Sequence, residues 1–175
     1  MLKVENFFNK FADMLGVITG TAMLLMILNV FYDVITRYAF RINSIAMQEM
    51  EWHLFSVVIL LGVAYTLKED GHVRVDIIYD KFSYRKKAII NMVGVIIAIL
   101  PISLLVGLSS IENATDAYLS MEQSGNPGGL PYRWIVKALI PLSFLMLIIT
   151  SIGFFIKNLN IFNGLHGSDE KRPVL

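Results

Sequence analysis

The stretch "QEMEWHLFSVVILLGVAYTL", residues 48–67, begins with polar and aromatic side chains and continues as an uninterrupted apolar run. Residues 54–67 contain no Asp, Glu, Lys, Arg or His. A helix needs about 20 predominantly apolar residues to cross a hydrocarbon core of about 30 Å. Trp and polar groups at its start suit the depth of the lipid headgroups. The stretch therefore predicts a membrane helix over residues 46–67 whose first turns lie at the interface.

The rest of the chain repeats this pattern. Of the 175 residues, 55% are apolar and 17% are charged, whereas soluble domains average about 45–50% and about 25%. The apolar residues gather in blocks long enough to span a bilayer, at residues 14–38, 46–67, 88–111 and 134–156. We predict an all-α integral membrane protein with four transmembrane helices in a single membrane domain over residues 1–175. Pro101 and Pro141 fall inside the last two spans and are expected to bend them.

The distribution of Lys and Arg predicts the orientation. Eleven of these residues fall on the side that holds both termini and the connection between the second and third spans, and four fall on the other side. Short cytoplasmic segments carry the excess of Lys and Arg. Both termini are therefore expected in the cytoplasm, and the cationic run "YRKK", residues 84–87, is expected to meet membrane lipids. Residues 165–175 are expected to form a flexible cytoplasmic tail.

The segment "VENFFNKFADML", residues 4–15, has helical amphipathic spacing before the first span. Val4, Phe7, Phe8, Phe11 and Leu15 share one stripe, and most of the polar side chains lie opposite. This predicts an N-terminal amphipathic helix in the membrane interface or against a neighbouring helix. The alternative is that these residues are the frayed start of the first span.

Polar side chains cluster at the outer ends of the first two spans. Asn29, Asp33 and Arg37 follow one another at intervals of four residues, and Glu49 and His53 have the same spacing. Asp33 four residues before Arg37 is the favourable order for a helical ion pair. Because polar groups facing lipid are costly, we expect these groups to face each other or another protein. An alternative is a network that only fixes helix packing.

The middle of every span lacks Asp, Glu, Lys, Arg and His: residues 14–28, 54–67, 88–111 and 138–156 contain none of them. A carrier that couples transport to ions by itself usually keeps such a group near the midplane. The chain also has no Cys and shows no nucleophile–base pair, phosphate loop, metal cluster or facing histidines for haem. We predict no enzyme activity, no cofactor, no metal site and no nucleic-acid partner.

The pieces in their order resemble the small membrane (Q-type) subunit of tripartite ATP-independent periplasmic (TRAP) transporters. The resemblance rests on "TRYAF" at residues 36–40, "QEMEWHLFSVVILLGVAYTLKEDGHVRVDIIYD" at residues 48–80 and "GLPYRWIVKALIP" at residues 129–141. Gln48 departs from the commoner pattern of two adjoining acidic residues, of which only Glu49 is present. Glu51, Trp52 and His53 resemble a subgroup of the family, and the alternating His72, Arg74 and Asp76 belong to its cytoplasmic loop.

The resemblance implies a four-helix subunit in a bacterial or archaeal inner membrane. Its partners would be a large (M-type) transport subunit, which works as a sodium-coupled elevator, and a periplasmic solute-binding protein that carries an organic acid. It implies binding-protein docking for Arg37, and we expect Arg41 to contribute. We expect a helix-network or large-subunit role for the residues at the outer ends of the first two spans: Asn29, Asp33, Glu49, Glu51, Trp52 and His53. Two alternatives remain: an anchor subunit of another complex, and an independent small channel or carrier.

Overall fold

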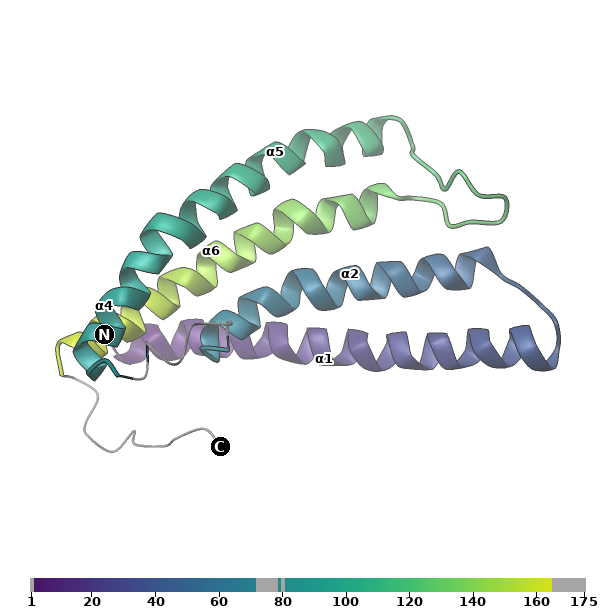
Figure 1. The fold of residues 1–175 in the computed structure, drawn as a ribbon. Coiled ribbons are helices and arrows are strands. Elements are labelled where there is room, and N and C mark those ends of the chain that lie inside the picture. Colours follow the sequence, from purple (N-terminus) through teal and green to yellow (C-terminus); the bar gives the residue numbers. More distant parts are fainter. Residues whose placement is uncertain (1, 72–78, 80, 165–175) are drawn as a thin grey trace.

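The computed structural model describes residues 2–71, 79 and 81–164, and this part of the chain is helical without a strand (Figure 1). The elements in order are α1 (Leu2–Ala39), α2 (Ile45–Lys68), α4 (Tyr84–Gly94), the π-helix η1 (Val95–Ile99), α5 (Leu100–Leu119) and α6 (Trp134–Phe162). Because α4, η1 and α5 follow one another without a break, Tyr84–Leu119 is one continuous helical span of 36 residues.

The predicted fold class is confirmed. Within the described residues four helices are long and apolar enough to cross a membrane. The shortest of them, α2, has 24 residues and rises roughly 36 Å at about 1.5 Å per residue, which exceeds the hydrocarbon thickness. Each predicted span lies inside one of these continuous helices.

The helices form two antiparallel hairpins, α1 with α2 and α5 with α6, and α6 packs against α1, α2, α4 and α5. In Figure 1 the two hairpins diverge from the end that holds the N-terminus and α4. We call this end the terminal end, and the opposite end, which holds residues 40–44 and 120–133, the loop end. A buried apolar cluster lies near the terminal end, where Leu67 of α2, Val95 of η1 and Phe154 of α6 meet.

Two glycines allow helices to cross closely near the terminal end. A Cβ at Gly153 of α6 would clash with the Cβ of Phe8 in α1. A Cβ at Gly16 of α1 would lie 2.7 Å from the ring of Tyr65 in α2. Small residues at such crossings are how membrane helices bring their backbones together.

The N-terminal segment is not a separate interfacial helix, because α1 runs unbroken from Leu2 to Ala39. Its buried face also differs from the predicted stripe. Glu5 is 4% exposed, whereas Phe7 is 66% exposed. The reason is a specific partner on α6: the side-chain amide of Asn160 donates a 2.7 Å hydrogen bond to Glu5, which places this one carboxylate on the buried face with Ala12 and Leu15. The segment is the helical start of the first span, and it also packs against α6.

The third span contains the irregularity expected at Pro101. Proline has no backbone N–H and its ring collides with the carbonyl four residues earlier. The five residues of η1, Val95–Ile99, adopt the wider π-helical turn just before it, which is a recognised way for a helix to absorb such a defect. Figure 1 shows the resulting curved path of α4, η1 and α5.

Candidate functional site at the loop end

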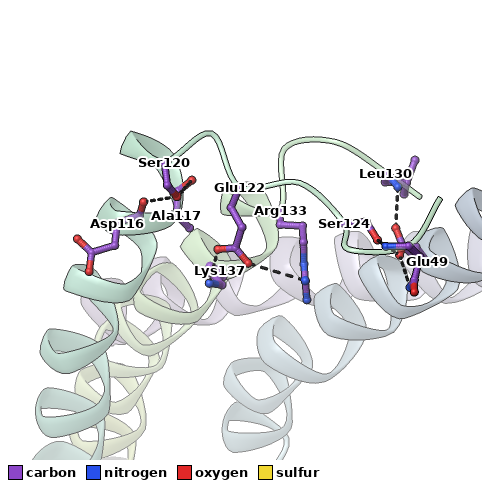
Figure 2. Close-up of polar contacts among 10 residues, drawn as sticks. Glu49, Asp116, Ala117, Ser120, Glu122, Ser124, Leu130, Arg133 and Lys137 are labelled. Carbon is purple, nitrogen blue, oxygen red and sulfur yellow. Dashed lines mark hydrogen bonds and ion pairs between the residues drawn. The ribbon is translucent and has the colours of Figure 1, made fainter. Parts of the chain in front are cut away.

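Glu49, one turn inside α2, binds the connection between α5 and α6 (Figure 2). Its carboxylate accepts a hydrogen bond from the hydroxyl of Ser124, one of 2.6 Å from the backbone N–H of Leu130 and one of 3.3 Å from the amide of Asn126. Hydrogen bonds to a carboxylate are roughly twice as strong as neutral ones. One side chain of the first hairpin thus fixes a loop of the second.

The loop has a backbone shape that suits this anchor. The N–H of Ser124 donates to the carbonyl of Leu130 at 3.2 Å, and the N–H of Gly129 donates to that of Asn126 at 3.0 Å. Gly128 has φ +81°, a conformation that favours glycine. A Cβ at Gly129 would lie 2.8 Å from Glu49 Oε2, so only glycine lets the backbone approach the carboxylate this closely.

A second polar contact ties the same loop to the start of α6. Lys137 Nζ lies 2.5 Å from Glu122 Oε2, and Arg133 Nη1 lies 3.8 Å from Glu122 Oε1 (Figure 2). The hydrogen bond from Lys137, together with the positive charges of Lys137 and Arg133, lowers the pKa of the Glu122 carboxyl from its ordinary value. Residues 120–133 are therefore held at both ends of the loop.

The first helix contributes a separate pair of contacts. Arg37 forms an ion pair with Asp33, as the spacing predicts, and the Asp33 side chain is 2% exposed while that of Arg37 is 40% exposed. Asn29 donates a 2.9 Å hydrogen bond to the backbone carbonyl of Met47 and so joins α1 to α2. The ion pair keeps the buried Asp33 charge compensated.

The polar residues of the two helices do not merge into one network. Among the described residues no hydrogen bond or ion pair links Glu49 or His53 to Asp33 or Arg37. Glu49 turns toward the 120–133 loop instead, and its carboxylate finds donors there. His53 Nδ1 is buried and receives no hydrogen bond within the part of the chain described.

The other residues predicted for the site are exposed or partly buried. Trp52 is 70% exposed and meets Phe55 edge-on, with ring centroids 6.4 Å apart. Glu51 is partly buried and makes no hydrogen bond or ion pair with any described residue. Arg41 is exposed in the connection after α1, with φ +57°. His72, Arg74, Asp76 and the predicted tail, residues 165–175, lie outside the described residues.

The sequence did not single out the partners of Glu49. Ser124, Asn126 and Leu130 are 75 to 81 residues away along the chain. The Asn-Pro-Gly-Gly turn at residues 126–129 indicated a tight reversal, but no local pattern tells which side chain of another helix will meet it. In residues 2–71, 79 and 81–164 no group of three or more His, Cys, Asp or Glu side chains is placed to hold a metal ion.

Comparison with known families assigns the chain. Residues 26–160 match the family described as tripartite ATP-independent periplasmic transporters, DctQ component. The match includes the part of the first span that holds Asn29, Asp33 and Arg37, the whole second span with Glu49, and the whole 120–133 loop. No curated protein matches the sequence closely enough to add a relative. With four apolar helices and a match over most of its length, the chain belongs to the DctQ family, the small permease component of TRAP transporters.

Proposed function

We propose that this small permease component serves a sodium-coupled, binding-protein-dependent transporter for an organic acid. In this proposal it enlarges the static scaffold beside a large transport subunit in the inner membrane. Its loop end, on the outer side in the predicted orientation, forms part of the docking surface for a soluble binding protein.

The scaffold role is supported by the apolar side chains that face outward from the bundle. In the most apolar window of each span only 11–28% of the residues are buried within the chain. On α1, side chains spaced seven residues apart are exposed by 63–79%: Val17, Leu24, Phe31 and Tyr38. If this chain alone formed a transport pathway through the membrane, polar side chains would have to line the middle of that pathway. Here the middles of the spans are apolar, which suits contact with lipid and with the helices of a partner.

The docking role is supported by the contacts that hold the 120–133 loop in a defined conformation. Loops of this length without secondary structure are uncommon unless they have a function. This one is held by Glu49 on α2 and by Lys137 on α6. Arg41 presents an exposed cation at the same end of the molecule. Together they offer a preformed surface, and preformed surfaces bind with less loss of conformational entropy.

Reconstitution tests the proposal. We expect the chain to copurify with its large transport subunit, and proteoliposomes that contain both subunits to take up substrate only with the binding protein and an inward sodium gradient. Proteoliposomes with this chain alone should show no uptake. Uptake by this chain alone, or failure to copurify with the large subunit, contradicts the scaffold role.

A further inference from the structure

The turn at residues 124–130 directs three hydrogen-bond donors at one carboxylate. The donors are the hydroxyl of Ser124, the side-chain amide of Asn126 and the backbone N–H of Leu130, and all three bond to Glu49 (Figure 2). Convergent donors on a single turn are a common way for proteins to bind anions. The turn therefore has the donor set of a carboxylate site, and in this structure a side chain of the same chain occupies it.

The shape of the turn comes from its own hydrogen bonds and not from Glu49. The N–H of Ser124 donates to the carbonyl of Leu130, and the N–H of Gly129 donates to the carbonyl of Asn126. The N–H of Asn126 also donates to the hydroxyl oxygen of Ser124 at 3.2 Å. Glu49 ties the turn to α2, whereas these three bonds set the positions of the donors within it. The donor set should therefore persist when the Glu49 carboxylate is removed.

The turn lies at the surface of the loop end. The residues at its tip are exposed: Gly125, Asn126, Pro127 and Gly128. Ser124, Leu130 and Glu49 are partly buried beside them. A ligand from outside the chain thus reaches the turn without passing through the helical bundle.

We propose that residues 124–130 are a carboxylate-binding site that exchanges Glu49 for a carboxylate from outside the chain. The incoming group is an acidic side chain of the soluble binding protein, which accepts the three hydrogen bonds that Glu49 gives up. This source of the carboxylate rests on the proposed docking role, whereas the site itself does not.

The exchange favours an incoming acid that is itself held in place. Glu49 belongs to the same chain as the turn, so it competes at an effective concentration on the order of millimolar or higher. A dilute free acid does not displace such a ligand. An acidic side chain of a docked protein is held beside the turn in the same way and competes on equal terms.

Hydrogen–deuterium exchange of the Leu130 amide, measured on the full chain in detergent, tests the site. Glu49→Ala empties it. Acetate on the order of 0.1 M should then slow the exchange several-fold, because a ligand of four non-hydrogen atoms can reach a roughly millimolar Kd. Glu49→Gln also removes the charge but leaves a side chain of the same size in the site, so acetate should have no effect on it.

Chloride at the same ionic strength is the control for screening. The site is overturned if acetate fails to slow exchange in Glu49→Ala, if it acts equally on Glu49→Gln, or if chloride acts as well as acetate. Should Glu49→Ala unfold, Glu49→Ser empties the site with an equally short side chain and is measured in its place.

Binding of the soluble binding protein to the reconstituted complex tests the source of the carboxylate. Acetate should weaken this binding several-fold when the complex carries Glu49→Ala, because both ligands then compete for the vacant turn, and equal chloride should not. Acetate that slows Leu130 exchange without weakening binding would overturn the exchange with the binding protein. A parent complex that fails to bind the protein at all would instead contradict the proposed docking role.

Discussion

At the scale of single residues, Glu49 receives hydrogen bonds from groups that lie 75 to 81 residues further along the chain. Glu51, two positions later, has no such partner among the described residues. The two glutamates share a helix and a membrane depth, so they form a natural pair for separating a specific contact from the effect of removing a charge.

Glu49→Ala should release the 120–133 loop. The donors of Ser124, Asn126 and Leu130 lose their charged acceptor, which raises the population of the open loop. We expect the backbone amide of Leu130 to exchange with deuterium on the order of tenfold faster or more. Glu51→Ala serves as the control and should leave this exchange unchanged. Equal exchange in both variants would show that the carboxylate does not hold the loop.

Arg37 and Arg41 differ in what their replacement should do. Arg37→Gln leaves the buried Asp33 charge unpaired, which should lower the stability of the chain by about 1–3 kcal/mol. The double variant Asp33→Asn with Arg37→Gln should recover most of this loss, because no lone charge remains. Thermal unfolding of the purified chain measures both. A double variant no more stable than Arg37→Gln would contradict this reading.

Arg41→Glu changes an exposed side chain without disturbing the ion pair of Arg37. We expect it to weaken binding of the soluble binding protein to the reconstituted complex and to leave assembly with the large subunit intact. The measurement is binding at low ionic strength, where exposed charges are least screened. Lys10→Gln, at the opposite end of α1, is the control. Unchanged binding would remove Arg41 from the docking surface.

The stability of the 120–133 loop should depend on pH through Glu122. The Lys137 hydrogen bond lowers the pKa of the folded carboxyl, so its contribution to loop stability is present above the carboxyl's ordinary pKa. That contribution is lost as the pH falls through the lower, folded value. A titration of the Glu122 carboxyl carbon by NMR should show a midpoint below that of an ordinary glutamate, and Lys137→Gln should move it upward. A midpoint that Lys137→Gln leaves unchanged would exclude Lys137 as the cause.

At the scale of the helical elements, α6 organises the bundle because it packs against both hairpins. It can do so because small and polar residues sit where other helices cross it. Ser151 and Gly153 are buried there. Asn158 accepts a 2.9 Å hydrogen bond from the side-chain amide of Asn91 in α4 and donates one to the backbone carbonyl of Phe154 in its own helix. Such contacts supply directed attraction in a bilayer, where apolar contact with lipid is equally good.

Gly153→Ala tests the crossing of α1 and α6. The new methyl group would clash with the Cβ of Phe8, which cannot swing aside as the end of a flexible side chain can. The helices must move apart, and overpacking of this kind costs about 1–3 kcal/mol. We expect a lower midpoint of thermal unfolding. Gly20→Ala, where the added methyl meets nothing within 4 Å, should keep or raise the midpoint; equal midpoints would argue against a close crossing.

At the scale of the whole molecule, the two ends of the bundle differ. The loop end has an ordered connection that, in our proposal, meets a soluble partner, and the buried apolar cluster of Leu67, Val95 and Phe154 lies near the terminal end. The flanks between them are apolar and exposed. The proposed docking role requires that the loop end lies on the outer side of the membrane.

Single cysteines measure that topology. The chain has no native Cys, and Ser83 and Gln123 are exposed at the terminal and loop ends. In intact cells with only the outer side of the inner membrane accessible, an impermeant thiol reagent should label Gln123→Cys and spare Ser83→Cys. Ser124 is unsuitable because its hydroxyl binds Glu49. Labelling of both variants, or of Ser83→Cys alone, would refute the predicted orientation.

The sequence by itself determined four membrane helices, the Asp33–Arg37 pair, a distortion of the third span near Pro101 and the family. Each of these depends on residues close together in the chain: an apolar run of sufficient length, an interval of four residues, a missing N–H or a motif. Only the tertiary structure decided that Glu49 holds the 120–133 loop, that Glu5 is buried against Asn160, and that α1 is one uninterrupted helix. These features depend on how each helix is rotated about its axis and where helices cross. In a chain whose helices are apolar on nearly every side, hydrophobic periodicity does not set that rotation; single polar contacts and glycine crossings between distant segments do.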